Sequence, residues 1–214
     1  MNEKLFDYIA VCPTAFHTCA HSADMLRESG YTELCEARRW EIVPGGKYFV
    51  TRNGSSLIAF RVPAGEIAGF MMTAAHGDSP AFKIKENAEL SDGNYLRLSV
   101  EKYGGMLCAP WLDRPLSVAG RVLVSEGDKL SVKLVDLKDP CAIIPNVAIH
   151  MNRNANDGMS YNAAVDMLPV WMSSEKGSFR TAVAKAAGVA EDAIVTGDLF
   201  LYDPQKGVTL GEYI

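Results

Sequence analysis

The sequence predicts an α/β fold in which a first part with a helix, a hairpin and a buried strand precedes a β-rich module. Three observations support this prediction. Apolar residues recur at helical spacing near the N-terminus, an Asn-Gly dipeptide separates two β-like runs, and short β-like segments predominate after about Glu86. The 214 residues are 48% hydrophobic and 22% charged, a composition sufficient for one large domain or two small ones.

The first predicted element is an amphipathic helix that begins after Pro13. Thr14 is a suitable N-cap, and Gly30 is a suitable stop. The apolar residues between them follow helical spacing and define one buried face: Phe16, Cys19, Ala20, Ala23 and Leu26.

The second predicted element is a β-hairpin. Residues 48–51 and 56–60 are rich in β-branched and aromatic side chains, and Asn53-Gly54 lies between them. Asn-Gly suits a tight turn because both residues tolerate positive φ.

The third predicted element is a buried strand over residues 67–75, whose sequence IAGFMMTAA is continuously apolar. His76 follows at its carboxyl end. Because ligands of open α/β sheets gather at the carboxyl ends of strands, His76-Gly77-Asp78 is expected at a functional site.

The β-rich module is predicted from short segments separated by turn residues. Strands are expected at 95–100, 118–124, 129–134 and 193–202, a helix at 179–187, and a polar Asn-rich loop at 152–162. Residues 197–203 are expected to remain unpaired and available to a partner chain. The sequence stops at Ile214 without a recognisable terminal signal, so we expect a fragment of a longer polypeptide.

Composition and charge exclude several classes of partner. The net charge of -5 and the pI near 5.4 provide no excess of cations for a phosphate backbone, so no nucleic acid is expected. Residues 1–10 lack a signal-peptide pattern, and no apolar run is long enough to span a bilayer, so no membrane is expected. Five widely spaced cysteines without CxxC pairing favour free thiols in the cytoplasm.

Two pairs of residues are candidates for metal chemistry. A zinc hydrolase needs a neutral imidazole ligand, and a carboxylate beside it can hold the correct tautomer, so His76 and Asp78 have a suitable spacing. The same spacing also occurs in exposed loops where the His is only hydrogen-bonded. His17 and His21 are four residues apart but lack the Glu of an H-E-x-x-H motif, and we reject them as a site.

Five segments resemble motifs of the aspartyl aminopeptidase family of zinc metallopeptidases, in the order in which that family has them. Residues 74–85 (AAHGDSPAFKIK) resemble its A-H-T-D-S-P-x-x-x-x-K motif. The other four are residues 12–17 (CPTAFH), 45–62 (GGKYFVTRNGSSLIAFRV), 103–121 (YGGMLCAPWLDRPLSVAGR) and 144–153 (IPNVAIHMNR). Gly77, Met106 and Cys108-Ala109-Pro110 depart from the family pattern, which leaves substrate preference open.

The resemblance implies a fold and a set of domains. The implied architecture is an incomplete zinc-peptidase α/β sandwich domain with an inserted β-rich dimerisation domain. Residues 1–87 would form the first part of the catalytic domain, 88–197 the dimerisation domain, and 198–214 the start of the return into the catalytic domain.

The resemblance also implies site residues. His76 would bind one of two zinc ions in the complete enzyme, and the remaining ligands would lie beyond Ile214. Asp78 and His150 are the expected catalytic residues. Asp78 would act by orienting His76, and His150 would reach the partner's active site to contact the substrate or the oxyanion. Without the resemblance, His150 would be an imidazole at the end of an apolar strand over 147–149.

The implied function is the zinc-dependent removal of N-terminal Asp or Glu from peptides by a homo-oligomer of dimers, with this chain inactive alone. The alternative is a non-enzymatic interaction or assembly module derived from such an enzyme. Among other charged residues, Lys83 and Lys85 are expected on one side of a strand, as solvated edge residues or as attractants for an acidic substrate. Asp113 and Arg114 are expected to find separate structural partners.

Overall fold

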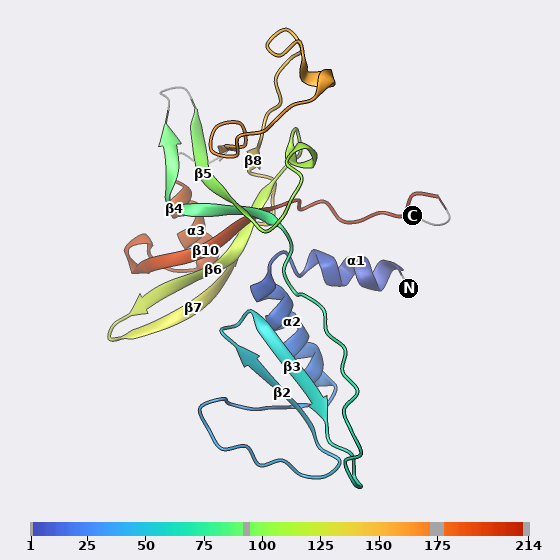
Figure 1. Ribbon diagram of the computed structural model, residues 1–214. Coiled ribbons are helices and arrows are strands. Elements are labelled where there is room, and N and C mark those ends of the chain that lie inside the picture. Colours follow the sequence, from blue (N-terminus) through green and yellow to red (C-terminus); the bar gives the residue numbers. More distant parts are fainter. Residues whose placement is uncertain (1, 92–94, 172–177, 212–214) are drawn as a thin grey trace. The chain divides into compact units, whose positions relative to one another are not determined.

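The computed structural model describes residues 2–91, 95–171 and 178–211, which form two compact units. Unit 1 consists of Met1–Ser79 with Gly207–Ile214, and unit 2 consists of Pro80–Lys206 (Figure 1). The predicted domains 1–87, 88–197 and 198–214 refer to roles in a complete enzyme and stay predictions; residues 92–94, 172–177 and 212–214 lie outside the described part.

Unit 1 contains two helices and a small sheet. Helix α1 spans Asn2–Ala10, a helix that sequence analysis did not predict, and α2 spans Ala15–Glu28. The strands β1 (Thr32–Glu33), β2 (Lys47–Arg52) and β3 (Ser56–Arg61) form a sheet in the order β1-β2-β3.

The predicted helix and hairpin of unit 1 are confirmed. Helix α2 buries Phe16, Cys19 and Ala23 of the predicted face. Thr14 occupies the N-cap, although its hydroxyl bonds His17 Nδ1 at 2.9 Å instead of a backbone N–H. Between β2 and β3, Asn53 and Gly54 have φ of 53° and 62°, the two positive values that a type I′ turn requires.

The prediction of a buried strand over residues 67–75 is wrong for this chain. The segment has no regular secondary structure, and the side chains at its centre lie in solvent: Phe70 is 87% exposed, Met71 104% and Met72 87%. A strand with apolar residues on both faces needs neighbours along its edges and above and below it. No strand of the described part of the chain pairs with this segment.

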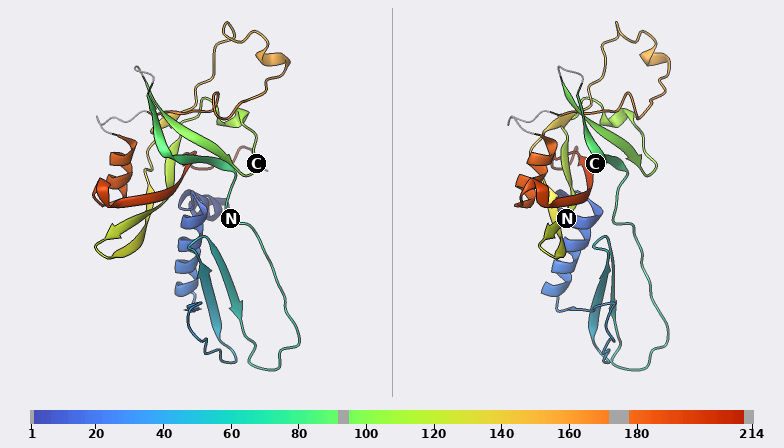
Figure 2. Two further views of the ribbon diagram at one scale, coloured as in Figure 1. Left: turned by 60° about the vertical axis from the view of Figure 1, so that its left-hand side comes forward. Right: turned by 90° about the vertical axis from the view of Figure 1, so that its left-hand side faces the viewer.

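The described residues of unit 2 form a curled antiparallel sheet, one α-helix and three short 3-10 helices, shown in two further views in Figure 2. Its strand order is β7-β6-β10-β4-β5-β9-β8. The strands are β4 (Ala81–Ser91), β5 (Leu96–Tyr103), β6 (Ser117–Glu126), β7 (Lys129–Asp136), β8 (Ala142–Ile143), β9 (Val170–Trp171) and β10 (Ile194–Tyr202).

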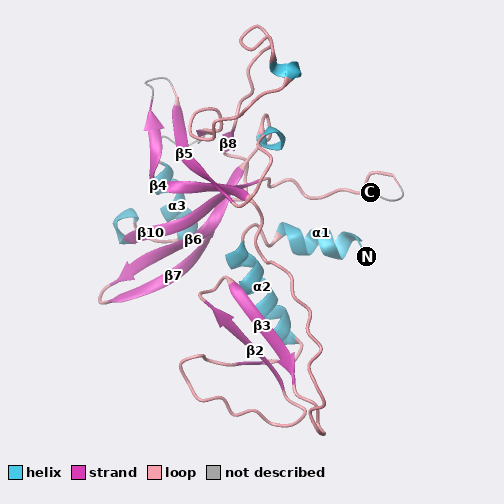
Figure 3. Cartoon of the chain, viewed as in Figure 1, coloured by secondary structure: helices cyan, strands magenta, loops and turns pink. Residues whose placement is uncertain are grey.

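Helix α3 spans Phe179–Ala187, as predicted (Figure 3), and both of its ends have capping residues. Ser178 caps the start by accepting a hydrogen bond from Thr181 N, and Gly188 ends the helix in the left-handed conformation with φ 67°. The predicted strands at 95–100, 118–124, 129–134 and 193–202 are confirmed as β5, β6, β7 and β10.

Strand β10 lies inside the sheet, so the prediction that residues 197–203 remain unpaired is wrong. It pairs with β6 from Ile194 to Tyr202 and with β4 at Phe200 and Lys83. The approach to β6 is close: a Cβ on Gly120 would lie 2.0 Å from the carbonyl oxygen of Asp198, so only glycine fits there.

An ion-pair network crosses the middle of this sheet. Asp198 on β10 accepts from Lys83 Nζ on β4 at 2.8 Å and from Arg121 Nη2 on β6 at 3.0 Å. Burial opposes charge on Asp198, but the hydrogen bonds and charges of Lys83 and Arg121 outweigh it and hold the pKa of the carboxyl below its ordinary value. Lys83 is therefore a structural residue of an interior strand and not a solvated edge residue.

Candidate functional site

His76 and Asp78 lie together in unit 1, at the end of the exposed segment. The imidazole side chain is 80% exposed, and its Nδ1 lies 2.8 Å from the Asp78 carbonyl oxygen and 3.2 Å from Asp78 Oδ1. Both neighbours of Nδ1 are acceptors. Nδ1 therefore carries a proton that it donates to these acceptors.

This geometry suits one ligand of a zinc site. A neutral imidazole with Nδ1–H directed at a carboxylate or a carbonyl is the usual state of a metal-bound histidine. The described residues do not provide a complete site, because no group of three or more His, Cys, Asp or Glu side chains among them is arranged to hold a metal ion. His76 thus fits zinc as a single ligand that needs others from elsewhere.

His150 belongs to unit 2 and lies on an exposed turn. Residues 147–149 form no strand, so the apolar strand that His150 would have ended is absent. The turn is closed by hydrogen bonds from Met151 N to Ala148 O at 2.8 Å and from Asn152 N to Ile149 O at 3.2 Å. His76 belongs to unit 1 and His150 to unit 2.

Asp113 and Arg114 find separate partners, as the sequence predicts. Asp113 Oδ1 accepts from Asn146 N at 2.8 Å, while Arg114 Nη1 lies 3.2 Å from Asp203 Oδ2. Asp113 is thereby tied to the start of the loop that carries His150.

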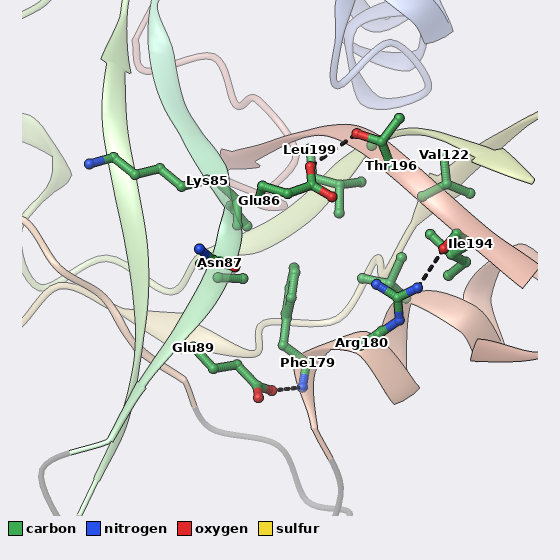
Figure 4. A pocket seen from close by; sticks show the side chains of 14 residues that line it. Lys85, Glu86, Asn87, Glu89, Val122, Phe179, Arg180, Ile194, Thr196 and Leu199 are labelled. Carbon is green, nitrogen blue, oxygen red and sulfur yellow. Dashed lines mark hydrogen bonds between the residues drawn. The ribbon is translucent and has the colours of Figure 1, made fainter. Parts of the chain in front are cut away.

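Unit 2 contains a pocket of about 330 Å³ that the sequence did not predict (Figure 4). Residues of β4, β6, α3 and β10 line it, so no single segment of the sequence predicts it. The one local signal is the polar run Lys85-Glu86-Asn87, which interrupts the alternation of β4.

Comparisons with known proteins agree with this fold. The chain is 43% identical over 219 residues to a probable M18 family aminopeptidase 2 of Clostridium novyi (strain NT), covering 98% of this chain and 51% of that relative. Chaetomium thermophilum mApe1 superimposes with a TM-score of 0.85 at 32% identity, covering 98% of this chain and 52% of the other. For the S. cerevisiae mApe1 dodecamer the TM-score is 0.79 at 27% identity, with 98% and 49% covered.

The mixed α/β fold with a curled antiparallel sheet matches that of a solved aminopeptidase, yeast aminopeptidase 1, with a TM-score of 0.79 at 26% identity. The model of the aminopeptidase I zinc metalloprotease family, M18, matches residues 8–213. The chain belongs to this family, and it spans about half the length of the curated relatives it matches. Among the described residues, the helices are too short or too polar to cross a membrane.

We expect the isolated chain to bind zinc only weakly. One oriented imidazole supplies a small part of the roughly 10–16 kcal/mol of a closed structural zinc site. Isothermal titration should give millimolar affinity, equivalent to about 4 kcal/mol. His76→Ala should remove that binding, whereas His21→Ala, on α2, should leave it unchanged. A tight one-to-one zinc site in the isolated chain would contradict this expectation.

Proposed function

We propose that the complete protein containing this chain is a zinc-dependent aminopeptidase that removes Asp or Glu from the N-termini of peptides. The observation that carries the proposal is the His76 imidazole, whose Nδ1 is held by Asp78 while Nε2 remains available. Membership of the M18 family supports zinc and aminopeptidase chemistry. The acidic preference is supported by the resemblance of residues 74–85 to the aspartyl aminopeptidase motif.

The residues of this chain would have three roles. His76 would donate the Nε2 lone pair to one of two zinc ions, and Asp78 would fix the ring tautomer and raise its basicity. Zinc, when bound, supplies Lewis acidity toward the scissile carbonyl. His150, on its exposed turn, would donate a hydrogen bond to the substrate or to the developing oxyanion in a partner subunit.

Oligomerisation and location belong to the same proposal. A related S. cerevisiae protein is described as a dodecamer, which supports a homo-oligomer of the complete protein. We also propose a cytoplasmic location for the complete protein, on the basis of its widely spaced cysteines without CxxC pairing. A non-enzymatic assembly module is the weaker candidate, because the curated relatives are described as aminopeptidases.

A substrate panel tests the proposal. The chain joined to the remaining half of the protein should hydrolyse Asp and Glu aminoacyl substrates at least about tenfold faster, in kcat/KM, than the Leu substrate. A chelator should abolish the activity and zinc should restore it, while the 214-residue chain alone should be inactive. A preference for the Leu substrate would reject the acidic specificity. Metal-independent activity, or none from the joined protein, would reject the assignment itself.

A further inference from the structure

The pocket of unit 2 lies where β4 separates from β10. The described residues of the two strands pair at Lys83 and Phe200, and beyond this point the pairing of β4 with β5 shifts register between Ile84 and Glu89. The intervening residues 85–88 therefore bulge away from the regular ladder. The bulge opens a space between β4 and β10, and α3 closes one side of it.

The floor of this pocket is apolar. It is formed by six buried side chains, Ile84, Val122, Phe179, Val183, Ile194 and Leu199, each at most 7% exposed. Gly197 contributes space, because a Cβ there would lie 3.1 Å from Arg121 O and 3.2 Å from Val122 Cγ1. The volume of about 330 Å³ is at the lower end of the range for ligand pockets, roughly 300–1,000 Å³.

Hydrogen bonds between different elements hold the walls in place. Thr196 Oγ1 donates to Glu86 Oε2 at 3.0 Å, which ties β10 to the bulge. Arg180 on α3 donates from Nη2 to Ile194 O at 2.5 Å and from Nε to Glu191 O at 3.1 Å. Glu89 Oε1 accepts from Phe179 N at the start of α3. These bonds preform the pocket, so a ligand would not need to organise it.

The charged side chains that form these bonds, one positive and two negative, have hydrogen-bond donors and acceptors that the bonds do not use. Arg180 has five N–H donors, and its two bonds go to carbonyl oxygens; no carboxylate of the described residues forms an ion pair with it. Glu86 Oε1 and Glu89 Oε2 accept none of the hydrogen bonds that hold the walls. In the view of Figure 4 the Phe179 side chain projects between Arg180 and Asn87.

We propose that this pocket binds a free α-amino acid with an apolar side chain. The carboxylate of the ligand would bond the Arg180 guanidinium, and its ammonium group would meet the free oxygen of Glu86. The apolar side chain would cover Phe179 and Val183. A zwitterion can pair with Arg180 and Glu86 at once, whereas a simple anion or a simple cation can pair with only one of them.

This site is separate from His76, which lies in the other unit, and the inference does not depend on the proposed peptidase activity. Failure of one therefore leaves the other standing, because ligand binding is measured without hydrolysis.

Titration of the 214-residue chain with L-leucine tests the proposal by ¹H–¹⁵N NMR. Leucine should shift the amides of β4, α3 and β10 that line the pocket. Two analogues serve as controls: 3-methylbutan-1-amine lacks the carboxylate, and 4-methylpentanoate lacks the ammonium group. Each should bind at least about tenfold more weakly, because one charge-assisted interaction is lost. Equal affinity for all three compounds, or shifts confined to residues outside the pocket, would overturn the proposal.

Variants separate the site from general effects on folding. Arg180→Gln should weaken leucine binding at least about tenfold. Lys129→Gln, on the exposed end of β7, removes the same charge elsewhere and should leave binding unchanged. Because Arg180 also ties α3 to β10, Ala88→Leu provides an independent variant that adds volume to the lining of the pocket. It should abolish the pocket shifts, and unchanged leucine binding in this variant would also refute the site.

Discussion

Replacement of His76 by alanine in the complete enzyme should lower kcat/KM for peptide hydrolysis by about a thousandfold or more. A bound zinc ion contributes several kcal/mol to transition-state stabilisation, and alanine offers no lone pair to hold that ion. Steady-state kinetics combined with measurement of bound zinc would check the result. The loss of activity should accompany a loss of zinc, because His76 is proposed to act through the metal.

Two further variants serve as comparisons for His76→Ala. Asp78→Asn keeps the size of the side chain but removes its charge, and it should weaken zinc binding or activity by about ten- to a hundredfold, as expected for a group that orients a ligand. His21→Ala removes an imidazole that contacts the Tyr8 ring on another helix and should leave kcat/KM unchanged. Near-normal activity of His76→Ala would exclude His76 from the metal centre.

The segment over residues 67–75 should become strongly protected from amide exchange in the complete protein. Phe70, Met71 and Met72 are at least 87% exposed in this chain, and burial of such side chains stabilises by about 1.5–3 kcal/mol each. Protection of the segment by about a thousandfold corresponds to a free energy of about 4 kcal/mol, which burial of these three side chains can supply. Hydrogen exchange followed by mass spectrometry, on this chain and on the complete protein, would measure the difference.

A matched substitution makes this prediction sharper. Met71→Asp should change the stability of the isolated chain by no more than about 0.5 kcal/mol, because the side chain contacts little. In the complete protein the same change should cost about 2–5 kcal/mol, since it places a carboxylate in an apolar environment. The hairpin of β2 and β3, already formed in this chain, is the internal reference for exchange. Equal exchange of residues 67–75 in both proteins would show that the segment is never buried.

The elements predicted correctly have signals that act over a few residues. Asn53-Gly54 permits two consecutive positive φ values, and Ser178 and Gly188 mark the ends of α3. The strand expected over 67–75 failed because burial depends on neighbours that a local pattern does not contain. Strand β10 was found, but its partners were not, since β4 and β6 lie far away in sequence.

The candidate site, too, was predictable only where residues close in sequence meet. The contact between His76 and Asp78 follows from a spacing of two residues, and the structure contains it. The proposed roles of His150 and of further metal ligands rest on the family resemblance, because no local spacing connects those residues with His76. The pocket of unit 2 was unpredictable because Glu86, Arg180 and Thr196 meet only after the sheet has formed.

The interior position of β10 has a consequence for the order of folding. Asp198 meets Lys83 across 115 residues of sequence and Arg121 across 77. Contacts of such high contact order form slowly, because long loops must close before they contribute. During synthesis β4 and β6 emerge from the ribosome before β10, the strand that lies between them in the sheet. The sheet can therefore form completely only after β10 has been made.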